Sequence, residues 1–291
     1  MRALVLSAGG NKSSYQVGAL KYLINELNIN YDIFNGVSAG GINAAYLSQF
    51  KNAFEENAVN KLEKIWLDIS NENVYKHWKP FGKLHAIFKS SFFDGSPLKK
   101  LIESNLDLNK LNSSGKIVTV GATSLTTGEY KIFDNKNPDF IEAVVAGASF
   151  PIMLSPVKIG SEYYTDGGIM QTTPIKTAIS LGATHLDIII TNPEISIKFH
   201  PHKLTVISSL KRILNLCTDQ LLKLDLESLN IYNKLAKLKC TDRKELIINI
   251  IRPKSILMEN ILDFNKDKIK DMIDVGYQDA KLQFNIESLK I

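Results

Sequence analysis

The chain has few cysteines and no long apolar run. Its 291 residues include only two cysteines, Cys217 and Cys240, too few for a disulfide framework and without the spacing of metal ligands. We therefore expect buried thiols that bind no metal. No cofactor is expected. No apolar stretch reaches the length that spans a bilayer, and no secretory leader is visible at the start. These absences predict a cytoplasmic or peripheral membrane protein, with leaderless export left open.

An excess of one charge is also missing. The chain carries 35 basic and 30 acidic residues, which gives a net charge of +5. No basic recognition motif accompanies this mild excess, so the sequence predicts no nucleic-acid partner. The oligomeric state is not predicted by any feature of the sequence.

Histidine is scarce, and no histidine stands in a recognisable catalytic context. A serine–aspartate–histidine order ending at one of the last three histidines stays open on spacing alone. The five are His77, His85, His185, His200 and His202.

What the sequence does contain is a Gly-x-Ser-x-Gly pattern at Gly36, Ser38 and Gly40. This pattern is typical of a nucleophile elbow, in which a serine occupies a sharp turn between a strand and a helix. Only one strand candidate, residues 3–7, precedes the turn, whereas an α/β-hydrolase normally places several strands before its elbow. A tight turn with an unreactive serine is the alternative interpretation.

A serine nucleophile needs a base, and Asp166 is the best candidate. It follows a strand-like segment and precedes Gly167 and Gly168, which allow close backbone approach. An ordinary turn aspartate would explain the same three residues.

The serine also needs donors for an oxyanion, and the glycine-containing segment 7–13 is a candidate to supply them. It ends the first strand and opens a helix, so its backbone amides are expected to point outward. Ala8 fits this loop if its φ is negative. Ser13 is expected to cap the following helix, since serine is a favoured N-cap residue.

Strands alternate with helices through the first 190 residues, which predicts an α/β fold. We expect three α/β/α layers around a mostly parallel sheet, with a helical C-terminal elaboration. A long helical pattern over 207–238 is typical of a helix packed on the domain, and a lid or dimer helix is the alternative.

The motifs, in this order, resemble the patatin-like phospholipases over residues 3–180. Residues 93–98, 123–129 and 146–151 match further signatures of that family. Residues 181–291 are then expected to complete the same globular unit, mostly as helices with one or two strands. The resemblance departs at Ala8 and Ser13, where the family commonly has glycine.

The resemblance implies a Ser38–Asp166 dyad that works without histidine or metal. It also implies an oxyanion hole made by the amides of Gly9, Gly10 and Asn11. Lys12 matches the family's basic loop position. Gly36, Gly40, Gly167 and Gly168 support the motifs.

The expected function is therefore serine acyl hydrolysis of phospholipids or lysophospholipids through an acyl-enzyme. An acyltransferase using the same dyad and a non-catalytic lipid-binding scaffold are the alternatives. The sequence predicts neither acyl-chain length, headgroup nor position on the glycerol.

The segment 75–100 combines six lysines and one acid, Asp94, with interleaved aromatic residues. Basic and aromatic side chains together suit an anionic membrane interface. A solvated lysine face over buried aromatics would give the same composition. The aromatic residues are Tyr75, Trp78, Phe81, Phe88, Phe92 and Phe93.

Overall fold

A mixed, mostly parallel sheet forms the centre of the protein. The computed structural model describes residues 1–54, 56–79, 89–194, 205–238, 244–258 and 260–285. The eight strands follow the order β5-β6-β3-β2-β1-β7-β8, with β4 paired to β3 outside this path. The strands are β1 (Arg2–Leu6), β2 (Ile33–Val37), β3 (Ile117–Ser124), β4 (Tyr130–Asp134), β5 (Val157–Ile159), β6 (Glu162–Asp166), β7 (His185–Ile189) and β8 (Ile247–Ile251).

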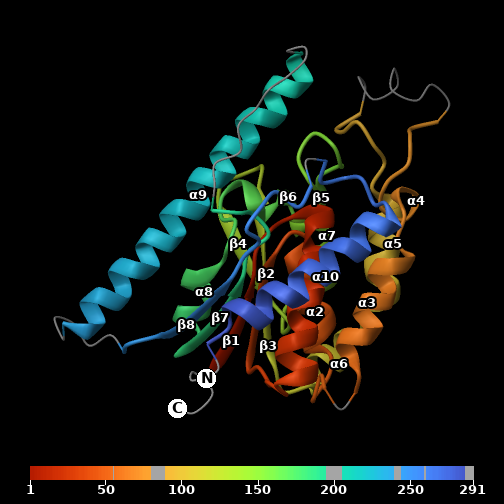
Figure 1. The fold of residues 1–291 in the computed structure, drawn as a ribbon. Helices are drawn as coiled ribbons and strands as arrows, with labels where there is room; N and C mark the ends of the chain where they lie inside the picture. Colours follow the sequence, from red (N-terminus) through yellow and green to blue (C-terminus); the bar gives the residue numbers. More distant parts are fainter. Residues whose placement is uncertain (55, 80–88, 195–204, 239–243, 259, 286–291) are drawn as a thin grey trace.

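Helices cover both faces of this sheet, which confirms the predicted three layers. In Figure 1, α8 and α9 lie on one side of the strands, and α2, α3 and α10 lie on the other. The helices are η1 (Gly10–Ser13), α1 (Ser14–Leu20), η2 (Lys21–Glu26), α2 (Ala39–Ser48), α3 (Ala58–Asp68), α4 (Asn71–Val74), α5 (Ser96–Asn105), α6 (Leu108–Ser113), α7 (Phe140–Gly147), η4 (Gly167–Ile169), α8 (Ile175–Ser180), α9 (Val206–Lys237) and α10 (Lys266–Gln283).

Strand β1 shows why the central strands are apolar throughout. Leu4 and Leu6 enter the larger core, which includes residues of α1, α2 and α10. Ala3 and Val5 point the other way, into the core that contains residues of α8 and α9. Successive side chains of a strand alternate between faces, so a parallel strand buried on both faces becomes a continuous apolar run.

The C-terminal part adds strands to the sheet as well as helices. Strand β7 pairs with β1, and β8 pairs with β7, both in parallel. Helix α10 crosses α1 at Gly18 and Gly276, where a Cβ atom on either glycine would meet the backbone of the opposite helix. This close crossing fixes α1, and with it the loop that precedes α1.

Two aromatic side chains of the segment 75–100, Tyr75 and Phe93, pack against the larger core. The rings of Tyr75 and Phe93 lie 4.6 Å apart between centroids, and Lys76 Nζ lies 3.3 Å from Asp94 Oδ2. Residues 80–88, which include Phe81 and Phe88, lie outside the described part of the chain.

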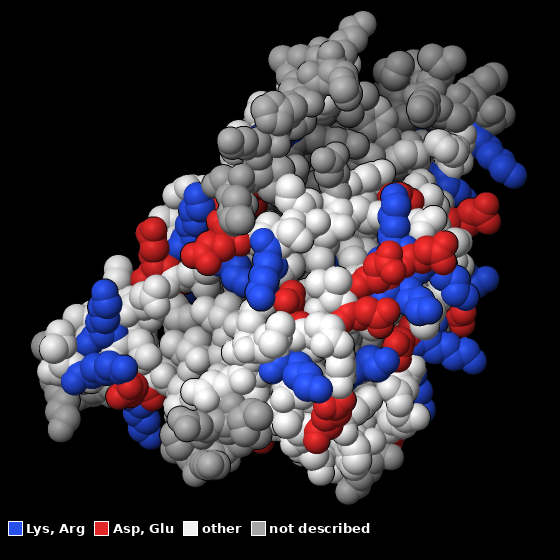
Figure 2. Space-filling view, in the orientation of Figure 1, with Lys and Arg blue, Asp and Glu red and all other residues white. Residues whose placement is uncertain are grey.

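Charges of both signs are interspersed on the visible face, with no large field of one sign (Figure 2). None of the described helices combines the length and the apolar character that crossing a membrane requires.

Candidate active site

The elbow places Ser38 in a strained turn between β2 and α2. Its φ of 57° and ψ of −135° lie in a region that residues with side chains rarely adopt. The flanking glycines permit this turn. A Cβ atom on Gly36 would meet the Gly40 carbonyl, and one on Gly40 would lie 2.8 Å from the Leu6 carbonyl oxygen. The strand that precedes the elbow is the second of the chain, as the sequence predicts.

Ser38 and Asp166 are in direct contact. The Ser38 hydroxyl donates a hydrogen bond of 2.6 Å from Oγ to Asp166 Oδ2. The other carboxylate oxygen, Oδ1, accepts a bond of 2.7 Å from the Gly168 amide. Asp166 ends strand β6, which pairs antiparallel with β3. The two residues that the sequence proposes as nucleophile and base are therefore brought together from positions 128 residues apart.

Burial makes Asp166 a stronger base than an ordinary aspartate. Its side chain is 2% exposed, and this burial raises its pKa to about 6, although the bonds from Ser38 and the Gly168 amide act in the opposite direction. A carboxylate with a pKa near 6 is ionised at neutral pH and accepts a proton more readily than an exposed one. Tyr130, which the sequence does not single out, is buried close enough for the Asp166 charge to contribute to its raised pKa.

Two backbone amides, those of Gly9 and of Gly10 at the start of η1, have no backbone acceptor in the described part of the chain. Gly10 has a φ of +58°, and a Cβ atom there would lie 2.6 Å from the Ile261 carbonyl oxygen, so this position favours glycine. Ala8 is not among the residues with positive φ, so its side chain fits the loop without backbone strain.

Asn11 differs from its predicted role. Its amide donates a bond of 3.0 Å to the Ile261 carbonyl and is thereby withdrawn from the predicted oxyanion set. The buried side chain donates to the carbonyls of Asn260 and Asp263, at 2.8 and 2.7 Å. Asn11 therefore ties the loop to the segment 260–263, a contact between residues about 250 positions apart.

Ser13 does not cap α1, contrary to the sequence prediction. It occupies the N-cap position, but its side chain makes no capping bond and its Oγ has no partner among the described residues. The reason is local: η1 runs directly into α1, so Ser13 already has helical φ and ψ of −70° and −7°. A capping side chain needs an extended backbone instead.

Lys12 is a half-buried cation beside this loop. Burial lowers the pKa of its ammonium to about 8, while the charge of Asp219 opposes the shift. The ammonium donates to Asn192 Oδ1, and the Asn192 amide in turn donates to Asp219 Oδ1 at 3.0 Å. Asn192 and Asp219 are site residues that the sequence analysis missed, because no local motif marks them.

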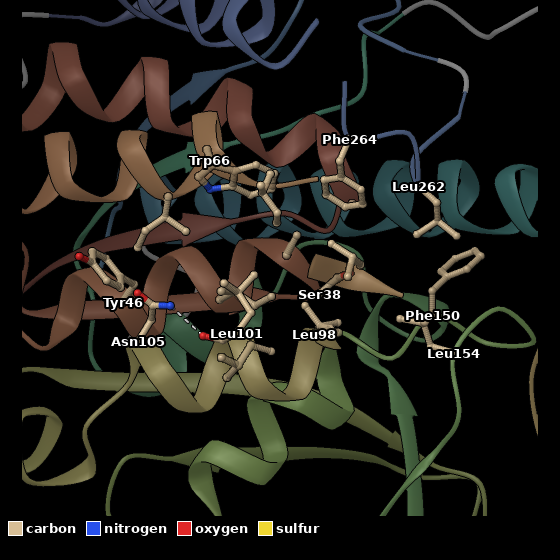
Figure 3. Close-up of a pocket in the computed structure, with 18 of the residues that line it drawn as sticks. Ser38, Tyr46, Trp66, Leu98, Leu101, Asn105, Phe150, Leu154, Leu262 and Phe264 are labelled. Atoms are coloured by element: carbon tan, nitrogen blue, oxygen red, sulfur yellow. Dashed lines mark hydrogen bonds between the residues drawn. The ribbon is translucent and has the colours of Figure 1, made fainter. Parts of the chain in front are cut away.

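Ser38 lies where two cavities meet. One, the apolar cavity, runs between α2, α3 and α5 (Figure 3). The other contains Lys12 and Asp166, for which we call it the polar cavity, and is bordered by α9. Both cavities share Gly10, Ser38, Phe150 and Ile261. The apolar cavity is also lined by Ile42, Tyr46, Leu62, Ile65, Trp66, Ile69, Leu98, Leu101, Ile102, Asn105, Leu106, Leu154, Leu262 and Phe264.

The sequence analysis did not predict the apolar cavity, and the residue pattern of α3 shows why. Leu62, Ile65 and Trp66 recur on one face of α3, and Ile69 follows as its C-cap residue. This pattern is the same as that of a helix that packs against solid core. Helix α9, for which a lid over the acyl site was the alternative, borders the polar cavity through Leu214, Asn215, Thr218 and Leu222.

No histidine described by the structure lines either cavity. His185 begins β7 and pairs with Arg2, at the end of the sheet opposite to Ser38. His77 packs against the Phe93 ring. His85, His200 and His202 lie outside the described residues. The described residues contain no group of three or more side chains suited to hold a metal ion.

Comparison with known proteins assigns the chain to a family. The family described as patatin-like phospholipase matches residues 4–179. A relative named "Probable lipid hydrolase 463L", from Invertebrate iridescent virus 6, is 27% identical over 198 residues, which are 61% of this chain and 63% of the relative. Among solved structures, VipD from Legionella pneumophila matches with 13% identity and a TM-score of 0.49, over 97% of this chain and 66% of VipD. The chain thus spans just under two thirds of both proteins. Because the family match covers more than half of the sequence, this chain belongs to the patatin-like phospholipase family.

Proposed function

We propose that this protein is a serine acyl hydrolase that cleaves fatty-acyl esters of phospholipids or lysophospholipids through an acyl-enzyme. The observation that carries the proposal is the position of the Ser38–Asp166 hydrogen bond, 2.6 Å long, at the junction of an apolar and a polar cavity. The two parts of a lipid ester match these two cavities, because an apolar acyl chain lies on one side of the ester carbonyl and a polar alcohol on the other.

In the first step, Ser38 Oγ attacks the ester carbonyl while its proton passes to Asp166 Oδ2. The tetrahedral oxyanion accepts hydrogen bonds from the amides of Gly9 and Gly10. When the carbon–oxygen bond to the alcohol breaks, Asp166 gives the proton to the departing oxygen. The acyl group stays on Ser38 with its chain in the apolar cavity.

In the second step, a water molecule attacks the acyl-enzyme and Asp166 takes one of its protons. Collapse of the second oxyanion returns that proton to Ser38 Oγ and releases the fatty acid. The Gly168 amide holds Asp166 Oδ1 at 2.7 Å in both steps, which keeps Oδ2 directed at the nucleophile.

The polar cavity is the proposed place of the alcohol part. Its half-buried Lys12 ammonium can attract the phosphate of a phospholipid, and the hydroxyls of Thr172 and Thr173 are buried without a partner among the described residues. We also propose that the segment 75–100 makes peripheral contact with anionic membranes. Pelleting with liposomes tests this contact: equal, negligible binding with and without anionic lipid contradicts it.

Fatty-acid release from phosphatidylcholine and lysophosphatidylcholine tests the proposed reaction. We expect wild-type protein to release fatty acid, and Ser38→Ala and Asp166→Asn to lose the activity. Ser113→Ala is the matched control, because it removes an exposed serine hydroxyl on α6. Release that persists in Ser38→Ala contradicts the assignment.

Acyl transfer is the competing reaction at the same dyad. Labelled phospholipid incubated with glycerol or lysolipid separates the two, since hydrolysis yields free fatty acid and transfer yields a new ester. A dominant new ester replaces the hydrolase proposal with an acyltransferase.

A further inference from the structure

The apolar cavity ends at a wall that it shares with a separate surface hollow. Tyr46, Asn105 and Leu106 line both spaces. The hollow beyond them is polar, with Lys61, Asp107 and Lys110 in its lining. Figure 3 shows Tyr46 and Asn105 at one end of the cavity and Phe150 and Leu154 at the other, with Ser38 between them. The Phe150 end joins the polar cavity, whereas the Tyr46 end borders the surface hollow.

Hydrogen bonds hold this wall in place. Gln49, the C-cap residue of α2, donates from Nε2 to the Asn105 carbonyl at 3.0 Å and accepts a bond of 2.7 Å from the Asp107 amide at Oε1. Tyr46 is 9% exposed, and its ring packs on Phe50 with 5.6 Å between centroids. The wall therefore joins α2 to the end of α5 and does not depend on one loose side chain.

The distance from the nucleophile to the wall sets a length. Ile42 and Tyr46 lie four and eight positions after Ser38 along α2, and both line the cavity. At a rise of about 1.5 Å per residue, Tyr46 lies about 12 Å from the nucleophile. An extended alkyl chain advances about 1.3 Å per carbon at ordinary bond lengths, so this distance holds an acyl group of about ten carbons.

Resting on the proposed function, we infer that Tyr46 is the residue that determines acyl-chain length, by closing the apolar cavity about ten carbons from Ser38. Among the three wall residues, Tyr46 has the largest side chain, and it comes from the helix that begins at the nucleophile. Truncation of this side chain joins the cavity to the hollow, which offers space to a longer acyl group.

A series of p-nitrophenyl esters from four to sixteen acyl carbons tests this inference. We expect wild-type kcat/KM to be highest near ten carbons and to fall for the sixteen-carbon ester. In Tyr46→Ala, the ratio of kcat/KM for sixteen over ten carbons should rise about tenfold, equivalent to about 1.4 kcal/mol. Tyr163→Ala is the control, since Tyr163 is 51% exposed on β6 and lines neither cavity.

A second variant tests the same axis without creating a cavity. Ile42 lies halfway between Ser38 and Tyr46, so Ile42→Phe should shorten the space and move the optimum to fewer than eight carbons. If Tyr46→Ala does not fold, as judged by its circular dichroism spectrum and thermal transition, Ile42→Phe decides. An unchanged optimum in the folded variants, with hydrolysis still dependent on Ser38, overturns the role of Tyr46 and leaves the proposed function standing.

Fatty-acid binding separates failure of the inference from failure of the proposed function. Saturated fatty acids titrated calorimetrically into Ser38→Ala protein need no turnover. We expect Ser38→Ala protein to bind the ten-carbon acid more tightly than the sixteen-carbon acid. The reverse order in protein that carries both Ser38→Ala and Tyr46→Ala would support the role of Tyr46, even if no ester is hydrolysed. Equal chain-length profiles in the two proteins overturn it.

Discussion

Gly40 of the nucleophile elbow lies directly against the Ser7 carbonyl at the end of β1, so that no side chain fits between them. This contact sets the distance between two parts of the site that the chain supplies separately. The elbow carries Ser38, and the loop after Ser7 carries the amides of Gly9 and Gly10, which have no backbone acceptor among the described residues. The proposed mechanism requires a fixed geometry between Ser38 and these two amides, and the missing Cβ of Gly40 allows the two backbones to keep it.

Gly40→Ala is therefore expected to separate the elbow from the loop. The added Cβ would meet the Ser7 carbonyl and lie 2.8 Å from the Leu6 carbonyl oxygen. We expect a loss of about 100-fold in kcat/KM, as for a misplaced catalytic group. Overpacking of this kind also costs about 1–3 kcal/mol in the free energy of unfolding. Ester hydrolysis and urea unfolding measure the two effects.

Gly95→Ala is the control for this substitution. Gly95 has a φ of −84°, and a Cβ atom there finds its nearest neighbour at 3.5 Å. Equal kinetics for the two variants would contradict the packing argument.

The raised pKa of Asp166 predicts an acid limb in the rate profile. Asp166 accepts a proton only when ionised, and its pKa is raised to about 6 by burial. We expect kcat/KM to rise with pH through about 6 and to level off above it. Stopped assays between pH 4.5 and 8 with a neutral ester measure the profile. A limb centred near pH 4, where an exposed aspartate titrates, would contradict the environment described for Asp166.

The same pKa shift predicts a dependence of stability on pH. In the unfolded chain Asp166 loses its proton near pH 4, whereas the folded protein keeps that proton until about pH 6. The folded state binds more protons in this window, so the free energy of unfolding falls as pH rises from 4 to 6, by about 3 kcal/mol for this group.

Asp166→Asn removes this titration. Urea denaturation at several pH values measures the free energy of unfolding of both proteins. As pH rises from 4 to 6, the wild type should lose stability relative to Asp166→Asn. A difference that stays constant from pH 4 to 7 is incompatible with a buried, titrating Asp166.

The tether from Asn11 predicts an effect of the C-terminal segment on the site. Asn11→Ala removes the donors to the Asn260 and Asp263 carbonyls, and a lost buried hydrogen bond costs about 1–3 kcal/mol. Because Ile261 and Leu262 line the apolar cavity, we expect KM for long-chain esters to rise more than kcat falls. Thermal unfolding and steady-state kinetics measure the two effects. Unchanged stability and unchanged KM in Asn11→Ala would contradict the role of this side chain as a tether.

Much of this architecture follows from local sequence. Gly36, Ser38 and Gly40 specify the elbow, because only that turn needs both glycines. The apolar run of β1 specifies a strand buried on both faces. Asp166 is recognisable through its neighbours Gly167 and Gly168, which form the turn that returns an amide to its carboxylate.

Other features depend on contacts between distant segments. The Asn11 amide loses its predicted role because Ile261, 250 positions away, accepts its hydrogen bond. Ser13 does not cap α1 because η1 precedes it without an extended residue. The apolar cavity is a space left between α2, α3 and α5, and an apolar face such as that of Trp66 reads the same whether it borders core or cavity.

The most direct test of the central claim is covalent labelling of Ser38 by a fluorophosphonate. This reagent phosphonylates an activated serine hydroxyl and displaces fluoride, and intact-mass spectrometry with peptide mapping locates the adduct. The account predicts one adduct at Ser38 in wild-type protein, none in Ser38→Ala, and a rate reduced by about 100-fold or more in Asp166→Asn. Unlabelled wild-type protein, or labelling that persists in Ser38→Ala, would contradict the assignment of Ser38 as the nucleophile.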